Sequence, residues 1–188
     1  MRLFIGIEID ERVRAAAAAI ADALARQLGS RLDARWIPRL NLHITLVFIG
    51  EVEDSRHASI IRTMDRPFAM RSFEIHVGGL GAFPSSGPPR VLWMGIGAGA
   101  GSLIELHGEV AERLAVLGIP REPRPYSPHL TIARIRTVHR RDYAVVRTML
   151  RDVAAEAGTC RVHHVTVFRS RLSPKGADYE PLLRVPLQ

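Results

Sequence analysis

Short apolar runs of strand length alternate along the chain with longer segments whose apolar residues recur at the spacing of one helix face. Residues 1–10 predict a first strand, and the alanine-rich segment 11–28, closed by Gly29, predicts a helix. The same patterns predict strands at 41–49, 72–80, 90–96, 129–136, 161–171 and 179–187, and helices at 54–64, 102–117 and 142–155. This alternation indicates a mixed α/β or α+β fold.

No low-complexity linker interrupts the 188 residues, so we expect a single domain spanning residues 1–188. A faint internal repeat is present, because His-x-Thr followed by an aliphatic residue occurs at 43–46 and again at 129–132. Each copy is followed by a helix-like segment and then another strand. A duplicated half, folded as two facing lobes, would bring the two histidine strands to a common cleft.

The composition narrows the class of protein. The hydrophobic fraction of 47% and the charged fraction of 24% are those of an ordinary globular chain. No apolar run approaches the ~18 residues needed to cross a bilayer, and the first ten residues are too quickly acidic for a signal peptide. Cys160 is the only cysteine, which excludes an internal disulfide and suits a reducing cytoplasm.

The formal charge is +7 and almost entirely due to arginine, since Lys175 is the only lysine. The planar guanidinium suits phosphate recognition, and a basic balance favours polyanionic partners. However, a GC-rich genome also enriches arginine, alanine and glycine in any protein. The charge therefore permits an RNA partner without requiring one.

The two His-x-Thr strands carry the candidate chemistry. Side chains two apart on a strand share a face, so His43 lies beside Thr45 and His129 beside Thr131. A histidine can exchange a proton near neutral pH, and a threonine hydroxyl can donate to a phosphoryl oxygen. One such motif alone is usually a solvated strand face. Two copies in separate halves indicate an acid and base pair acting on one phosphorus atom.

These residues resemble the two-histidine (2H) phosphoesterases, and within them the bacterial and archaeal RNA 2′,3′-cyclic phosphodiesterases, also called 2′-5′ RNA ligases. The resemblance covers essentially the whole chain in order. Its segments are Trp-Ile-Pro at 36–38, Asn-Leu-His-Ile-Thr-Leu at 41–46, 78–84 through 90–93, Ser-Pro-His-Leu-Thr-Ile-Ala-Arg at 127–134, and 167–172 followed by Gly176 and Tyr179.

The resemblance implies an α+β fold of two pseudo-symmetric, mainly antiparallel sheets with outer helices and a central cleft between two lobes. It also implies hydrolysis of a terminal 2′,3′-cyclic phosphate on RNA, or of related cyclic nucleotides, to a 2′-phosphomonoester. No cofactor and no metal are expected, and a cytoplasmic monomer without membrane association is the expected state.

By the same analogy, His43 would be the acid for the departing 3′ oxygen and His129 the base for water. Thr45 and Thr131 would hold the phosphoryl group, and Arg134 would offset charge in the transition state. Strict alternation conflicts with the last role, because it places Ala133 rather than Arg134 on the catalytic face. Either the strand bulges there or the long arginine reaches round its end.

Other signals favour structural explanations or stay open. The glycines of 95–101 follow a strand and precede a helix, but the acid expected of a dinucleotide site is missing, so a strand–helix connection is the better interpretation. The spacings of the remaining histidines match no zinc pattern. The loop carrying Arg121, Arg124 and Tyr126 is either an RNA contact or an ordinary basic loop.

Two other functions remain open from the sequence. The reverse transesterification would join RNA halves through a 2′-5′ linkage with the same histidines. A non-catalytic RNA-end or nucleotide-binding module would keep the fold but would not need a matched acid and base. Replacing either histidine distinguishes an enzyme from such a module.

Overall fold

The computed structural model describes residues 1–173 and 176–188, so Lys175 lies outside the described residues. Its helices are α1 (Glu11–Leu28), α2 (Asp54–Met64), α3 (Ala100–Ala115) and α4 (Tyr143–Asp152). Its strands are β1 (Arg2–Glu8), β2 (Leu32–Trp36), β3 (His43–Glu51), β4 (Phe73–Phe83), β5 (Val91–Ile96), β6 (His129–Val138), β7 (Glu156–Val162), β8 (His164–Ser173) and β9 (Gly176–Pro186). Short 3-10 turns occupy Gly29–Arg31, Arg39–Asn41 and Arg140–Asp142.

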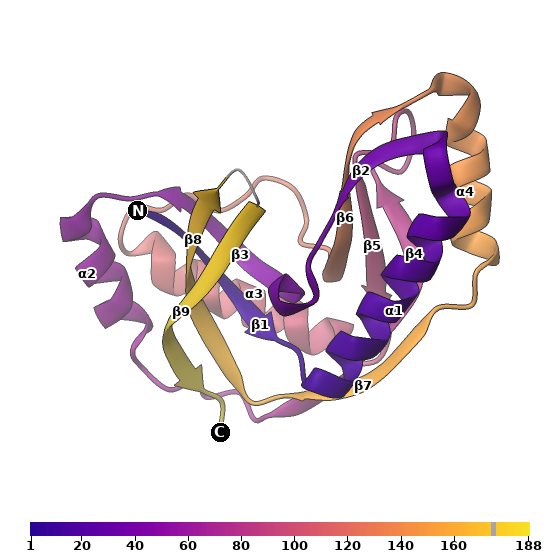
Figure 1. The fold of residues 1–188 in the computed structure, drawn as a ribbon. Coiled ribbons are helices and arrows are strands. Elements are labelled where there is room, and N and C mark those ends of the chain that lie inside the picture. Colours follow the sequence, from indigo (N-terminus) through magenta and orange to yellow (C-terminus); the bar gives the residue numbers. More distant parts are fainter. Residues whose placement is uncertain (174–175) are drawn as a thin grey trace.

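All named strands pair antiparallel and form two lobes, as the sequence predicts for an α+β fold. The first lobe has the strand order β3-β1-β8-β9, and the second has β6-β5-β4-β7 with β2 added to β6. A single residue pair, Ile44 with Leu130, joins β3 to β6 and makes one continuous sheet. Figure 1 shows the two lobes rising on either side of this junction.

The lobes do not coincide with the two halves of the chain. The first lobe combines the N-terminal β1 and β3 with the C-terminal β8 and β9. Helix α1 and strand β2, although N-terminal, pack in the second lobe against β7 and β6. The sequence repeat therefore marks two equivalent motif strands, and the expectation that each half folds into its own lobe is wrong.

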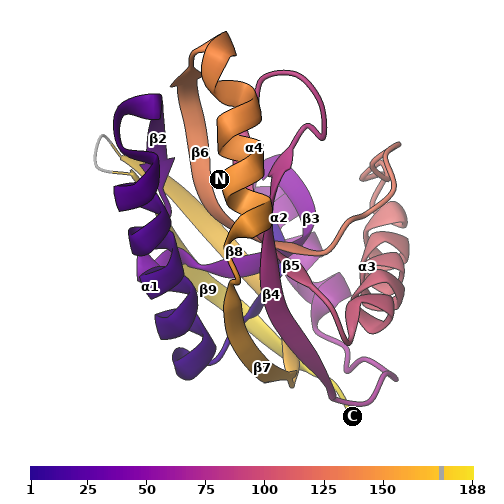
Figure 2. The same cartoon turned by 90° about the vertical axis from the view of Figure 1, so that its right-hand side faces the viewer.

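Helices cover the outer faces of the sheet. α3 packs on β3 and on α2 in the first lobe, whereas α1 and α4 cover the second lobe, as Figure 2 shows. α1 begins where the Asp10 side chain accepts a hydrogen bond from the Val13 amide (2.8 Å), and it ends at Gly29, whose φ is 51°. Its buried stripe follows the helical spacing and consists of Val13, Ala17, Ala21, Leu24 and Leu28. Among the described residues, no helix is long and apolar enough to cross a membrane.

Candidate active site

The two histidines lie at the junction of the lobes. His43 begins β3 and His129 begins β6, each one position before the residue of the joining pair. Ile44 and Leu130 are fully buried, so the side chains that flank them point to the opposite face. In an antiparallel arrangement about this pair, His43 stands across from Thr131 and Thr45 across from His129. The strand pair that joins the two lobes thus has all four motif side chains beside it.

Each imidazole is oriented by the backbone two residues before it. The Nδ1–H of His43 donates to the carbonyl oxygen of Asn41 (2.7 Å), and that of His129 donates to the carbonyl of Ser127 (2.7 Å). A carbonyl can only accept, so Nδ1 carries the proton in the neutral ring and Nε2 is left free. For His43, Nε2 lies 3.1 Å from the hydroxyl oxygen of Thr45. In both rings, therefore, Nε2 is the nitrogen atom that can accept a proton.

The His43 ring is the more enclosed of the two. It packs against Phe4 (centroids 4.7 Å apart) and the edge of Tyr179 (5.0 Å). Burial is the main cause that lowers its pKa to about 4, helped by the positive charge of Arg134. Burial also lowers the pKa of His129, again with Arg134 contributing. Among the described residues, the one aromatic ring that contacts His129 is Phe83, at a centroid distance of 5.0 Å.

A bulge in β6 resolves the conflict over Arg134. Thr131 pairs with Trp93 and Ala133 with Leu92, so Ile132 has no partner on β5. The burial pattern changes phase at this point, because Ile132 and Ala133 are both fully buried. Arg134 is thereby turned to the face of His129, and the carbonyl of Ile132 accepts from the Ile37 amide (2.9 Å).

The first motif strand, β3, has a bulge of the same kind. Thr45 pairs with Gly6 and Val47 with Ile5, which leaves Leu46 without a partner on β1. The bulges fall at the same place in the two motifs, three residues after each histidine. Consequently Phe48 occupies in the first lobe the position that Arg134 occupies in the second.

Gly6 is required by the approach of β3. A Cβ at this position would lie 2.7 Å from the carbonyl oxygen of Ile44 and 3.5 Å from Cδ2 of His43. Any side chain there would push against the strand that carries the catalytic candidate. The sequence reasoning passed over this glycine, although it interrupts an apolar strand, which is a signal of close backbone approach.

The motif residues line two adjoining hollows. The narrower one is bounded by His43, Thr45, Thr131 and Arg134, together with Phe4, Ile37, Asn41, Phe48 and Tyr179. It opens beside a cavity of about 470 Å³ whose lining is Arg2, Arg35, Ile37, Pro38, Asn41, Phe48, Arg134, Ser170, Ala177 and Tyr179. The lining of the narrower hollow thus contains the residues predicted from the sequence except His129, whose position on β6 sets it across from Thr45. The aromatic side chains of this lining, and Arg2 and Arg35, were not predicted as site residues.

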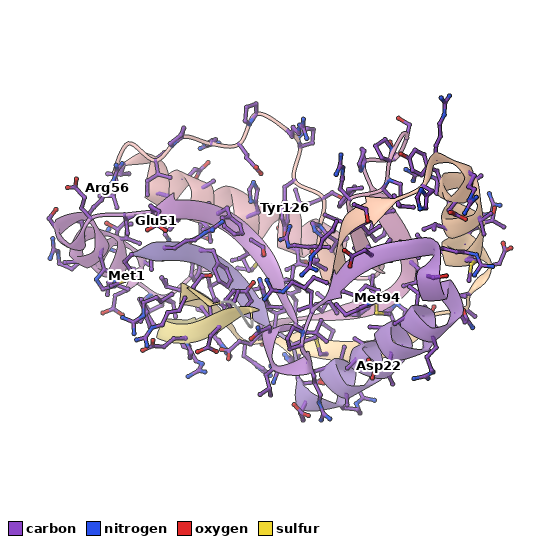
Figure 3. The ribbon with its side chains drawn as sticks, turned by 45° about the horizontal axis from the view of Figure 1, so that its top comes forward. Met1, Asp22, Glu51, Arg56, Met94 and Tyr126 are labelled. Carbon is purple, nitrogen blue, oxygen red and sulfur yellow. The ribbon has the colours of Figure 1, made fainter. Side chains whose placement is uncertain are left out.

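Tyr126 supports the site from behind rather than facing RNA. Its O–H donates to the carbonyl of Thr45 (2.9 Å), and its ring stacks on His107 with centroids 4.3 Å apart. His107 in turn contacts the carbonyl of Leu46 through Nδ1 (2.9 Å). These two side chains provide hydrogen-bond partners for backbone carbonyls of β3 where this strand diverges from β6. Figure 3 shows Tyr126 near the junction of the lobes. A base-stacking role for Tyr126 is therefore not what the structure shows.

The other signals examined in the sequence have structural explanations. Gly99 is left-handed (φ 81°), and a Cβ there would collide with the backbone of Glu74, so the glycine-rich stretch is a tight strand–helix connection. His76 contacts Glu156 (2.8 Å) and His164 contacts Glu8 (2.8 Å). Within residues 1–173 and 176–188, no three His, Cys, Asp or Glu side chains gather as metal ligands would.

Comparison with known proteins places this chain in a family. The chain is 33% identical to the RNA 2′,3′-cyclic phosphodiesterase of Archaeoglobus fulgidus, over 97% of this chain and 98% of that protein. It is 36% identical to the enzyme of the same name from Aeropyrum pernix, over 77% and 81% of the two chains.

The fold agrees with a solved structure as well. The crystal structure of TT0787 of Thermus thermophilus superposes with a TM-score of 0.79 at 24% identity, covering 99% of this chain and 97% of that one. The sequence profile of the 2′-5′ RNA ligase superfamily matches residues 7–173. This chain belongs to the 2′-5′ RNA ligase superfamily.

Proposed function

We propose that this protein hydrolyses 2′,3′-cyclic phosphates at RNA ends to 2′-phosphomonoesters. The observation that carries the proposal is the pair of imidazoles on two strands that pair at Ile44 and Leu130. Their Nδ1–H groups are held by equivalent carbonyls, which leaves each Nε2 without a proton in the neutral ring. Such a pair matches the need for a base and an acid at one phosphorus atom. The names of the two relatives support the same activity.

We propose the role of each histidine from how open its ring is. His129, the less enclosed ring, takes a proton from water through Nε2 as the water oxygen bonds to phosphorus. His43, held among aromatic rings, gives a proton from Nε2 to the 3′ oxygen as the bond between that oxygen and phosphorus breaks. The phosphate stays on the 2′ oxygen. A second turnover requires His43 to regain a proton and His129 to lose one.

The remaining polar residues bind the phosphoryl group. The hydroxyls of Thr45 and Thr131 donate to its non-bridging oxygens, and the guanidinium of Arg134 offsets the charge that grows in the transition state. An anionic phosphate beside His43 favours its protonated form. Bound substrate thus counteracts the burial that lowers the pKa of this ring to about 4 in the free protein. The chain itself supplies an acid, a base and an anion site, so we propose that no cofactor or metal is needed.

Ligation is a second outcome of the same chemistry. If the 5′ hydroxyl of another RNA replaced water, the same two histidines would form a 2′-5′ linkage, the reaction for which the superfamily is named. Hydrolysis should dominate in water unless that second end is held in place. A binding module without activity is disfavoured because binding alone needs no matched acid and base.

We further propose that residues 1–188 act as one domain and as a monomer in the cytoplasm. The continuous sheet across the lobe junction supports the first statement. The lone Cys160, which is buried and unpaired, suits a reducing compartment.

The test is turnover of a short RNA bearing a terminal 2′,3′-cyclic phosphate, in EDTA, with the 2′- and 3′-phosphate products resolved. The proposal predicts a 2′-phosphate product that disappears in His43→Ala and in His129→Ala. Adding a second RNA with a free 5′ hydroxyl measures ligation in the same reaction. Tight binding of the cyclic end without turnover would instead support the binding module.

A further inference from the structure

The carbonyl that orients His43 belongs to Asn41, the only asparagine of the chain. Asn41 ends the 3-10 turn Arg39–Asn41, and its backbone N–H donates to the carbonyl of Pro38 (2.8 Å). An asparagine in a turn usually bonds through its side chain to the backbone of that turn. The side chain of Asn41 reaches further, because its Nδ2–H donates to the carbonyl of Ala177 on β9, 136 positions away (2.5 Å). The turn before His43 is therefore fastened to the β8–β9 hairpin.

The same hairpin packs against the ring of His43. Tyr179 follows Ala177 by two positions on β9, so the two residues share a face, and both line the larger cavity. The Tyr179 ring meets His43 edge-on with centroids 5.0 Å apart, and the centroid of Phe168 on β8 lies 5.9 Å from that of His43. The hairpin thus contacts His43 through two aromatic rings. Through Asn41, it also holds the carbonyl that accepts the Nδ1–H of this ring.

The bond between Asn41 and His43 fixes both the tautomer and the angle of the ring. In a neutral imidazole, the nitrogen that carries the proton is set by the hydrogen bond that the ring makes. The Asn41 carbonyl accepts from Nδ1 (2.7 Å), so Nε2 is the nitrogen that exchanges a proton in the reaction. Nδ1 keeps its proton throughout. The bond therefore holds the ring in one orientation before and after Nε2 gives its proton to the 3′ oxygen.

The second histidine is supported by different elements. The Nδ1–H of His129 donates to the carbonyl of Ser127, and the neighbouring Tyr126 donates to the carbonyl of Thr45 on β3. These bonds involve β3 and β6 rather than β9. A change in the side chain of Asn41 should therefore act on His43, and His129 provides a reference within the same molecule.

We propose that Asn41 is a positioning residue for the acid step. Its side-chain amide fastens the turn to β9, and its carbonyl then holds the Nδ1–H of His43 so that Nε2 gives the proton. The inference rests on the proposed function, because it takes His43 as the acid. Asn41 lines both hollows, but its contribution is the orientation of His43 and not the binding of substrate.

The first readout is the tautomer of the two histidines, measured by NMR of the ring nitrogens in protein with isotope-labelled histidine at neutral pH. His43→Gln and His129→Gln assign the signals, and Nδ1 should carry the proton in both rings of the wild type. Asn41→Leu keeps the branched shape but loses the donor, so part of the His43 signal should change to the tautomer with the proton on Nε2. The His129 signals should not change. Asn41→Ser, whose side chain is too short to reach Ala177, should give the same result and replaces Asn41→Leu if leucine disturbs the fold.

The second readout is kcat and KM with a short RNA bearing a terminal 2′,3′-cyclic phosphate. Both Asn41 variants should lower kcat about tenfold or more, since a misplacement of about 1 Å costs up to about 10²-fold. kcat/KM should fall by the same factor, because the lost orientation acts in the transition state. The matched control is Gln27→Leu, which makes the same change from amide to leucine on the exposed face of α1. It should leave the tautomers and both kinetic constants unchanged.

Wild-type tautomers in the Asn41 variants would overturn the proposal, whatever the value of kcat. An unchanged kcat would overturn it as well, and a rise in KM alone would mean that Asn41 contacts the substrate instead. Failure of the proposed function would look different, because the wild type would then not turn over the RNA. In that case, the NMR comparison still decides whether Asn41 fixes the tautomer of His43.

Discussion

Removing His43 should make the folded state less sensitive to acid. Burial lowers the pKa of this ring from 6.5 to about 4, so the unfolded chain binds a proton in the interval where the folded protein does not. Stability therefore falls as the pH drops from about 6.5 toward 4. Between pH 7 and pH 4.5 the loss due to this ring alone is about 2.5 kcal/mol.

The assay is urea unfolding of the wild type and of His43→Gln at pH 7 and pH 4.5. Glutamine does not titrate, so the variant should lose about 2.5 kcal/mol less than the wild type between the two conditions. The free energy of unfolding falls by about 2 kcal/mol per molar urea, so the urea midpoint should drop between pH 7 and pH 4.5 by about 1 M less in His43→Gln than in the wild type. The comparison cancels the acid sensitivity of His129 and Glu8, which both proteins retain.

His139→Gln, which removes an exposed histidine, is the control for the substitution itself. Equal losses of stability in the wild type and in His43→Gln would refute the reasoning. They would mean that the ring is not held in its neutral form by its aromatic surroundings.

Three further changes test other parts of the site. Arg134→Gln should move both limbs of the pH profile of kcat/KM to higher pH, because the arginine lowers the pKa of both histidines. Limbs that stay in place would show that Arg134 does not set the pKa of either histidine. Tyr126→Phe leaves the partly buried carbonyl of Thr45 without the hydroxyl that donates to it and should cost about 1–3 kcal/mol in urea unfolding, with a lower kcat; unchanged stability and unchanged kcat would show that Tyr126 does not position β3. Gly6→Ala forces a methyl group against the Ile44 carbonyl and should lower the free energy of unfolding by about 1–3 kcal/mol in thermal or urea unfolding. An unchanged free energy of unfolding would show that β3 can move away from β1 without cost.

The strand that carries each histidine could be predicted because the residues around each histidine alternate between apolar and polar. Leu42, Ile44 and Leu46 face the core while His43 and Thr45 do not, and the structure confirms this pattern. The five-residue strand β2 was not predicted, since it is short and pairs only with β6. The sequence pattern predicted one strand at 161–171, whereas this range contains the end of β7 and most of β8, which are separated only by His163.

The position of Arg134 shows where local reasoning ends. Alternation placed it on the wrong face, and only the pairing with β5 reveals the bulge at Ile132. A bulge depends on the neighbouring strand, which no pattern within one segment can indicate. For the same reason the sequence did not predict that Arg35 faces Arg134 or that Phe48 lines the same cavity, because these positions come from strand pairing across the fold.

The central claim is that His43 and His129 act together on one phosphate, and single-turnover rates of the two alanine variants and the double variant test it most directly. With a saturating cyclic-phosphate RNA, each single variant should lose about 10²-fold or more. The double variant should lose little beyond the worse single variant, because an acid and base that work as a unit are not additive. If the losses instead multiplied, or if one histidine could be removed with little effect, the two residues would not form the proposed pair.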